Sequence, residues 1–328
     1  MKHISIIIPE GDCSLTHIEA THQILSEVNV MLAAKDRPRL FSIQLVGLNK
    51  ESGIKKGMYT VLPDVLMKDV HRTNLIIIPA LQGSDMRKAL EINQPFIPWI
   101  IQQHAMGAEL ASLCLGSFLL ADTGLLKGKK CTTHWGYASA FRDMFPDVDL
   151  ITEKILVDEG GIYSSGGALS FTNLILYLIE KYAGRDIAIM AAKIFMIDID
   201  RESQNPFIMF NGQKGHEDES IKKAQEFIEK NFSEKLTVED LASRFAIGRR
   251  NLERRFKKAT SNTVVEYIQR VKIEAAKMSL ESSRENVTEV MYKVGYTDTK
   301  AFRTTFKKIT GLSPIQYRSK YNREMAAV

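Results

Sequence analysis

The sequence has few cysteines and no long apolar run. Cys13, Cys114 and Cys131 form no CxxC pair and no metal-ligand spacing with histidine, so we expect reduced thiols, no structural disulfide and no zinc. No cofactor is predicted. The opening segment, MKHISIIIPEGD, has an apolar run too short for a signal peptide, and no stretch of about 18 apolar residues occurs. These absences argue against a secreted or membrane-spanning protein and favour a cytoplasmic one.

Length and charge both indicate more than one domain. The chain has 328 residues, 45% of them hydrophobic, which is enough for two or three domains with cores of their own. Residues 218–328 hold 23 lysines and arginines against 15 acidic residues, a net charge of +8, whereas residues 1–217 hold 21 against 24, a net charge of −3. A basic C-terminal part is typical of domains that neutralise nucleic-acid phosphates.

Two segments in the last third share one spacing pattern. They read TVEDLASRFAIGRRNLERRFKK and NVTEVMYKVGYTDTKAFRTTFKK, and they predict helix-turn-helix units near residues 237–258 and 287–308. We expect glycine to supply the unusual backbone angles of each turn, at Gly248 and at Gly295. At an offset of 49 residues, the pattern pairs Ala242 with Met291, Ala246 with Gly295 and Leu252 with Ala301.

The second helix of each unit carries polar and basic side chains that suit contact with bases and phosphates. Alone, such a stretch is typical of a solvated helix surface, but its repetition within the basic part of the chain favours DNA. The predicted DNA-binding residues are Arg249, Arg250, Asn251, Arg254, Arg255, Lys257, Lys258, Thr297, Asp298, Thr299, Lys300, Arg303, Lys307 and Lys308.

Three motifs in order, RxLxRxF (residues 250–256), VGY (residues 294–296) and GLSPIQYR (residues 311–318), resemble the AraC/XylS-type DNA-binding domain. The resemblance covers residues 219–320. It implies an all-α domain in which a long helix, here residues 264–280, joins two helix-turn-helix motifs. Two such heads would enter successive major grooves of double-stranded DNA, about 34 Å apart.

The first 200 residues have a different pattern. Residues 201–218, where hydrophobic periodicity lapses, are predicted to be a linker. Alternating strands and helices predict an α/β fold with a doubly wound, mostly parallel sheet of flavodoxin-like or amidotransferase-like topology. The predicted strands are residues 4–9, 41–48, 75–79 and 109–113, and helical patterns cover residues 16–32 and 169–182.

One strand is predicted to end in a sharp elbow. Cys114 ends the apolar run, Gly116 permits a turn, and helix-forming residues 118–121 follow. We expect Cys114 to face solvent at the carboxyl edge of the sheet, where helix N–H groups favour a thiolate or a bound anion. Doubly wound sheets bind ligands at this edge.

This elbow, the opening strand, TTHW (residues 132–135) and SSGG (residues 164–167) resemble class I glutamine amidotransferase-like domains of the ThiJ/PfpI type, over residues 1–195. The order of the two domains is similar to that of the GlxA-type branch of AraC regulators. That resemblance implies that the N-terminal domain dimerises and senses a small nitrogenous metabolite. The predicted ligand-binding residues are Glu10, Gly83, Ser84, Cys114, Leu115, His134, Trp135 and Gly166.

An enzymatic role is the alternative, because related proteases and isonitrile hydratases use an elbow cysteine. A cysteine nucleophile needs a base or another source of thiolate stabilisation. The proteases have histidine after this cysteine, where Leu115 stands here, and the hydratases have an early acidic residue, where Thr16 stands. Glu10 or Glu19 remain as substitutes. We predict no enzymatic activity, with a cysteine-dependent hydrolase or hydratase at Cys114 as the alternative.

Together these features predict a homodimeric transcription factor that binds promoter DNA and responds to a small-molecule effector. Contact with RNA polymerase, and activation rather than repression, follow only from the family resemblance. No membrane partner is expected.

Overall fold

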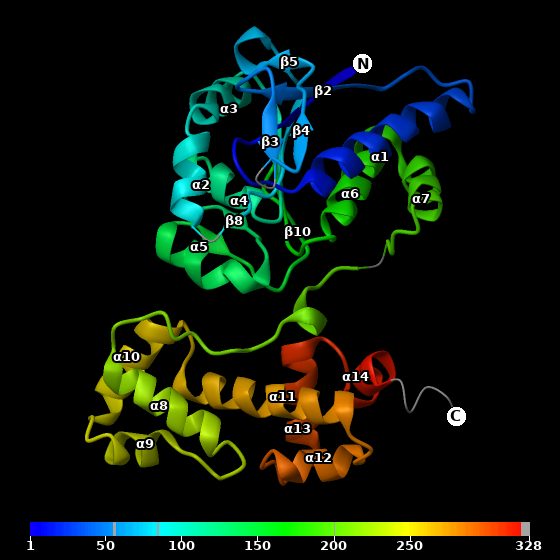
Figure 1. The fold of residues 1–328 in the computed structure, drawn as a ribbon. Helices are drawn as coiled ribbons and strands as arrows, with labels where there is room; N and C mark the ends of the chain where they lie inside the picture. Colours follow the sequence, from blue (N-terminus) through cyan, green and yellow to red (C-terminus); the bar gives the residue numbers. More distant parts are fainter. Residues whose placement is uncertain (55–56, 84, 200, 323–328) are drawn as a thin grey trace. The chain divides into compact units, whose positions relative to one another are not determined.

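The computed structural model describes residues 1–54, 57–83, 85–199 and 201–322 (Figure 1). Contacts within the chain divide it into two compact units, unit 1 (Met1–Gln204) and unit 2 (Asn205–Val328). Unit 1 is an α/β domain with a mostly parallel sheet, and unit 2 is helical. The predicted fold class is therefore confirmed.

Unit 1 is built on a seven-stranded sheet. Its strands are β1 (Lys2–Ile7), β2 (Phe41–Gly47), β5 (Val65–Leu66), β6 (Leu75–Ile78), β7 (Glu109–Leu113), β10 (Leu156–Asp158) and β11 (Ile162–Ser165). Their spatial order is β10-β11-β7-β6-β1-β2-β5, and only the β10–β11 pair is antiparallel. The direction of winding therefore reverses between β1 and β6. Two short ladders lie outside this sheet, β3 (Ser52–Ile54) with β4 (Tyr59–Val61), and β8 (Lys130–Cys131) with β9 (Asp149–Leu150).

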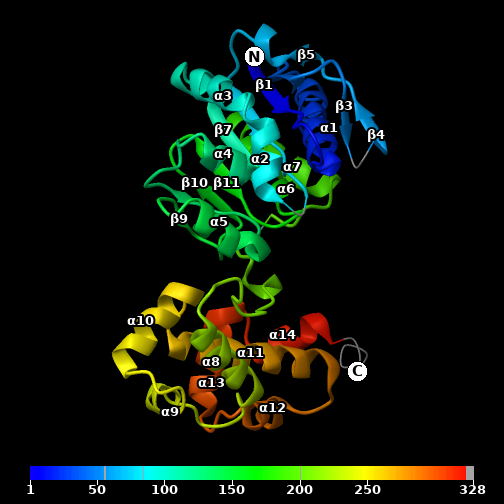
Figure 2. The same cartoon turned by 60° about the vertical axis from the view of Figure 1, so that its left-hand side comes forward.

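Helices cover both faces of this sheet (Figure 2). One face packs against α1 (Leu15–Ala33), α6 (Phe171–Ala183) and α7 (Arg185–Ile194), and the other against α2 (Met86–Asn93), α3 (Phe96–Ala105), α4 (Gly116–Asp122) and α5 (Ala138–Met144). Side chains alternate along β1: Ile4 and Ile6 join the core on the first face, and Ile7 joins the core on the second. Burial on both sides is what a parallel sheet requires.

Unit 2 contains seven α-helices among its described residues. They are α8 (Glu219–Lys230), α9 (Val238–Arg244), α10 (Arg249–Thr260), α11 (Val264–Ser282), α12 (Val287–Lys293), α13 (Thr299–Thr310) and α14 (Pro314–Tyr321). Two hydrophobic clusters hold them, one beneath α9 and α10 and the other beneath α12 and α13. The described residues also form three short 3₁₀ turns, η1 (Met67–Asp69), η2 (Trp135–Tyr137) and η3 (Asn205–Phe207). No helix in the part of the chain that the structure describes is long and apolar enough to cross a bilayer.

The repeat within unit 2 changes offset at its turns. Helices α9 and α12 correspond at 49 residues, and each begins with a capping box, at Thr237 and at Asn286. Helices α10 and α13 correspond at 50 residues, because the second turn is one residue longer. Buried Leu252 therefore corresponds to buried Phe302, and its predicted pairing with Ala301, which is exposed, is wrong.

The turn residues also differ from the prediction. In the first turn Ala246 takes the left-handed conformation, with φ of 52°, whereas Gly248 has φ of −57° and caps α10. In the second turn Gly295 is left-handed, with φ of 74°, as predicted. Ala246 is exposed, so its methyl group has room and the cost of the conformation is confined to the backbone.

The segment predicted as a linker packs against both units in turn. The Gln204 side chain is buried in unit 1, where its amide donates to the carbonyl oxygens of Thr133 (3.0 Å) and Thr152 (2.9 Å). Beyond it, Lys277 Nζ donates to the Ile208 carbonyl at 2.6 Å, within unit 2. The division between the units thus falls directly after Gln204.

Gly116 provides a test of the packing between α4 and the sheet. A Cβ atom at this position would lie 2.2 Å from the Ile78 carbonyl oxygen and 2.7 Å from that of Pro79. We expect Gly116→Ala to destabilise unit 1 by about 1–3 kcal/mol, because backbone atoms must move apart. Gly53→Ala, whose nearest neighbour would be 3.9 Å away, is the control. Urea unfolding measures both, and equal stability of the two variants would contradict the close approach.

Candidate functional sites: two basic recognition helices and the carboxyl edge of the sheet

Helix α10 exposes one face of polar and basic side chains. Its buried residues, Leu252, Phe256 and Thr260, recur every four residues and leave the opposite face free. Arg250, Asn251, Arg254, Lys257 and Lys258 are exposed on it. Arg254 Nη2 donates to Asn251 Oδ1 at 2.9 Å, so two candidate base-contacting groups lie side by side near the start of the helix.

Some predicted contacts of the first helix are engaged within the protein. Arg255 is half-buried, and its Nε donates to Asp218 Oδ2 at 2.8 Å, which ties α10 to the N-terminus of α8. Arg249 forms ion pairs with Glu239 and Glu253, and Lys257 Nζ donates to the Ser261 carbonyl at 2.9 Å. Arg255 therefore has a structural role, whereas Arg249 and Lys257 remain exposed enough to meet a partner.

Helix α13 repeats this arrangement with other side chains. Phe302, Phe306 and Thr310 are buried, and Thr297, Asp298, Thr299, Lys300, Arg303, Lys307 and Lys308 are exposed. Thr297 lies in the turn, and Asp298 caps the helix by accepting from the Ala301 N–H at 2.6 Å. The sequence analysis missed Thr304, which is exposed and corresponds to Arg254 at the true offset of 50 residues.

The carboxyl edge of the unit 1 sheet brings together segments that are far apart in sequence. Glu10, Gly83, Cys114 with Leu115, and Gly166 follow β1, β6, β7 and β11 respectively, and Ser84 lies outside the described residues. Backbone hydrogen bonds join neighbouring loops: Gln82 N–H donates to the Asp12 carbonyl at 2.8 Å, and Cys114 N–H donates to the Ser165 carbonyl at 2.9 Å. The edge is thus closely packed at its centre.

Cys114 occupies the predicted elbow, but its thiol does not face solvent. The residue is left-handed, with φ of 54°, and only 4% of its surface is exposed. Burial raises the pKa of the Cys114 thiol to about 12, and a hydrogen bond from the Leu115 N–H opposes this shift but does not cancel it. The prediction that Cys114 faces solvent is therefore wrong. Burial disfavours the thiolate in this conformation, because desolvation outweighs the favourable field of the short helix that follows.

Several other predicted ligand residues are involved in local structure. A Cβ at Gly166 would lie 2.0 Å from Gln204 Nε2, so this glycine packs against Gln204, which the sequence analysis missed. Leu115 is 7% exposed. His134 Nδ1 accepts from the Gly136 N–H at 3.1 Å, and the centroids of the His134 and Trp135 rings lie 5.4 Å apart in a tilted arrangement. Burial lowers the pKa of His134. His134 and Trp135 remain partly exposed.

Glu10 lies on the β1 side of the same edge. Its carboxylate accepts from Asn49 Nδ2 at 3.0 Å and from Ser52 Oγ at 3.1 Å. Asn93 bonds to both the N–H and the carbonyl of Glu10. The side chain is partly exposed, so an oriented carboxylate is present at this rim of the edge.

His17 is a buried histidine of this region that sequence reasoning left out of the site. Its Nδ1 accepts from the Ala80 N–H at 3.2 Å, and its Nε2 donates to the Ala168 carbonyl at 2.9 Å. The neutral ring thus joins the loops after β6 and β11. Burial lowers the pKa of His17 to about 4.

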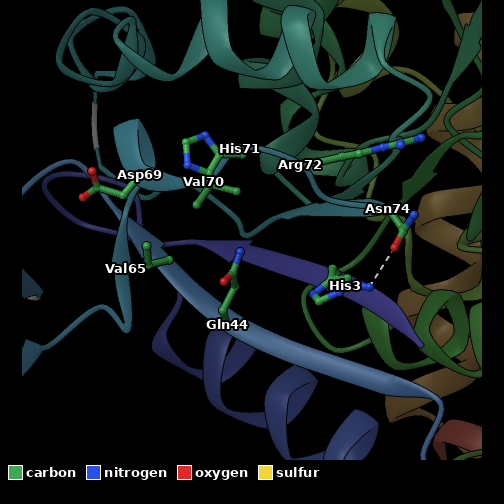
Figure 3. Close-up of a pocket in the computed structure, with 8 residues that line it drawn as sticks. All are labelled: His3, Gln44, Val65, Asp69, Val70, His71, Arg72 and Asn74. Carbon is green, nitrogen blue, oxygen red and sulfur yellow. Dashed lines mark hydrogen bonds between the residues drawn. The ribbon is translucent and has the colours of Figure 1, made fainter.

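A separate cavity of about 600 Å³ lies toward the opposite end of the sheet (Figure 3). It is lined by His3, Gln44, Val65, Asp69, Val70, His71, Arg72 and Asn74. The His3 N–H donates to Asn74 Oδ1 at 2.8 Å across its margin. His3 and Asn74 mark the amino ends of β1 and β6, so this cavity is distinct from the predicted ligand edge.

Comparison with known proteins matches each unit to a family. Residues 241–320 match a helix-turn-helix domain model, and residues 24–181 match the DJ-1/PfpI family. Over 224 residues the chain is 25% identical to the transcriptional regulator GbdR of Pseudomonas aeruginosa, covering 68% of this chain and 61% of GbdR. Over 165 residues it is 30% identical to isonitrile hydratase of Pseudomonas putida, covering 50% of this chain and 64% of the hydratase. The chain thus spans less than two thirds of these relatives.

A solved structure supports the fold. An AraC family transcriptional regulator from Pseudomonas putida superposes with a TM-score of 0.51 at 15% identity, covering 60% of this chain and 100% of that one. At this identity the likeness concerns the fold alone.

The environment of His17 predicts a pH dependence of stability. Burial lowers the pKa of His17 from 6.5, the ordinary value in an unfolded chain, to about 4, so protons bind the unfolded chain first as the pH falls. Stability of unit 1 should therefore decrease by up to about 3 kcal/mol between pH 6.5 and 4.

Urea unfolding at a series of pH values measures this effect. His17→Gln, whose amide can accept from Ala80 and donate to Ala168, should lack this part of the pH dependence. His22→Gln, an exposed position on the same helix, should retain it. An unchanged pH slope in His17→Gln would show that another group is responsible.

Proposed function

We propose that this chain, which combines a DJ-1/PfpI domain with an AraC-type helix-turn-helix domain, is a transcriptional regulator that binds specific promoter sequences. The observation that carries the proposal is the pair of recognition helices, each with a buried apolar stripe and an exposed basic face. The net charge of +8 on residues 218–328 supports binding to phosphates through counterion release.

The two heads offer different chemistry to DNA. Arg250 and Arg254 on α10 suit the O6 and N7 atoms of guanine, and Asn251 suits adenine. On α13 the positions that correspond to Arg250 and Arg254 carry Lys300 and Thr304, and a threonine methyl can contact thymine. We therefore infer that each protomer reads two unlike half-sites, with α10 more selective for guanine.

We further propose that unit 1 senses a small effector at the carboxyl edge of its sheet and forms a homodimer. The partly exposed Glu10, His134 and Trp135 support a cationic, nitrogenous ligand, because a carboxylate and an indole face both attract such a group. We propose that Gln204 transmits the effect of ligand binding to unit 2, since it packs against Gly166 and immediately precedes Asn205, the first residue of that unit. Contact with RNA polymerase, and activation as the output, complete the proposal by analogy with the family.

The buried thiol with its raised pKa supports a non-enzymatic role for Cys114. The similarity to isonitrile hydratase is the observation that favours the alternative, a hydratase or hydrolase. The two functions differ in what they require of Cys114: a nucleophile must lose its proton, whereas a packing residue need not.

Selection from random duplex DNA by the full-length protein tests the central proposal. A repeated motif should be enriched, and its affinity should fall steeply with salt. Arg254→Ala should weaken binding by about 1–3 kcal/mol and relax specificity at one position, whereas Lys307→Ala should weaken binding to all sequences and reduce the salt slope by about 1. Arg87→Ala, an exposed arginine of unit 1, is the matched control. A folded protein that enriches no motif would refute the proposal.

A Cys114→Ala variant separates the regulator from the enzyme. It should bind the selected DNA as tightly as the unsubstituted protein, because Cys114 lies in unit 1 and its thiol is buried. Binding is measured by fluorescence anisotropy, and turnover of isonitriles and amides is measured in parallel with both proteins. Turnover that disappears in the variant would establish the enzymatic alternative.

A further inference from the structure

Helix α11 belongs to both halves of unit 2. Its first part, with Val264, Tyr267 and Val271, enters the cluster beneath α9 and α10, and its second part, with Ile273 and Ala276, enters the cluster beneath α12 and α13. Lys272 lies between these two parts and is only 7% exposed. A lysine at the junction of two apolar clusters requires a reason, because burial of an ammonium group is costly unless it is hydrogen-bonded.

The Lys272 ammonium group bonds to one segment from each half. Its Nζ donates to the Glu234 carbonyl oxygen at 3.2 Å and to the Gly295 carbonyl oxygen at 3.1 Å. Glu234 belongs to the loop between α8 and α9, and Gly295 is the left-handed residue of the second turn. Nζ also lies 5.5 Å from the centre of the Tyr296 ring. One side chain thus joins the first half to the turn that positions α13.

The second turn has no room for a larger residue at this contact. A Cβ on Gly295 would lie 2.1 Å from the Ser233 carbonyl oxygen and 2.7 Å from Lys272 Nζ. The corresponding residue of the first turn, Ala246, is left-handed as well but exposed. The two turns therefore differ because the α8–α9 loop packs directly on the second one. Phe232, in the same loop, packs against both hydrophobic clusters.

We propose that Lys272, together with Gly295, is a positioning residue that locks the two recognition helices in one relative arrangement, so that the protein accepts a single separation between its two half-sites. This inference rests on the proposed DNA-binding function. Neither residue needs to touch DNA. The ammonium group acts by holding the α8–α9 loop against the second turn, and without it two carbonyl groups lose a buried donor.

A half-site spacing series tests the consequence for DNA. The duplexes carry the sequence selected by the unsubstituted protein, with one base pair inserted or removed between half-sites, which rotates one half-site by about 35° relative to the other. The affinity of the unsubstituted protein should fall about tenfold when the spacing is changed by one base pair in either direction. Lys272→Met should bind the duplex of original spacing more weakly than the unsubstituted protein does, and its affinity should fall only about threefold when the spacing is changed. Lys272→Met keeps the aliphatic stem and removes the charge.

Lys277→Met is the matched control. Lys277 is another buried lysine of α11, but it bonds to the Ile208 carbonyl and to Glu274 and does not join the α8–α9 loop to the second turn. This variant should retain the spacing preference even if its stability falls. The proposal would be overturned if Lys272→Met discriminated between the spacings as strongly as the unsubstituted protein. It would also be overturned if Lys272→Met and Lys277→Met lost the spacing preference equally.

A distance measurement without DNA separates this inference from the proposed function. Spin labels at Glu253→Cys and Arg303→Cys, exposed positions on α10 and α13, report the separation of the two helices by electron paramagnetic resonance. The three native cysteines are buried, so the labels attach selectively. Lys272→Met should broaden a narrow distance distribution, and Lys277→Met should not. A narrow distribution in Lys272→Met would refute the lock, whereas failure of DNA selection with a broadened distribution would refute only the DNA-binding function.

Discussion

The basic surface of unit 2 depends on the burial of one apolar stripe on each recognition helix. Leu252 and Phe256 hold α10, and Phe302 and Phe306 hold α13. Because an α-helix separates its faces by a fixed period, burial of these side chains decides which basic groups meet solvent. The long helix α11 contributes to both clusters, so the two surfaces share one support. For the proposed reading of two half-sites, a shared support would reduce the orientational entropy that independent helix-turn-helix motifs would lose on binding.

Unit 1 illustrates how packing changes the chemistry of a familiar arrangement. A cysteine at a strand-to-helix elbow is a nucleophile where water, a base or a strong positive field reaches it. Here the loops of the carboxyl edge hydrogen-bond to one another, and 4% exposure of Cys114 removes most of its hydration. The raised pKa follows from this burial.

The proposed regulation would require a connection between the carboxyl edge of the unit 1 sheet and unit 2. A ligand can shift a conformational equilibrium only by binding its two states unequally. Gln204 is well placed for such a connection. Its amide bonds to the segment that precedes His134, and it packs against Gly166 before the chain enters unit 2. Sequence patterns did not reveal this residue, because a glutamine in a polar stretch carries no periodic signal.

The amino-acid sequence by itself determined the two folds, the strand that ends directly before Cys114 and the basic faces of the recognition helices, because these depend on local periodicity and on charge. Only the tertiary structure showed that Arg255 pairs with Asp218. It also showed that Thr304 on α13 corresponds to Arg254 on α10, and that Ala246, not a glycine, is the left-handed residue of the first turn. It also decided the state of the Cys114 thiol and the contacts of Lys272. These features depend on which distant segments approach one another, and burial and hydrogen bonding at such contacts are set by packing in three dimensions.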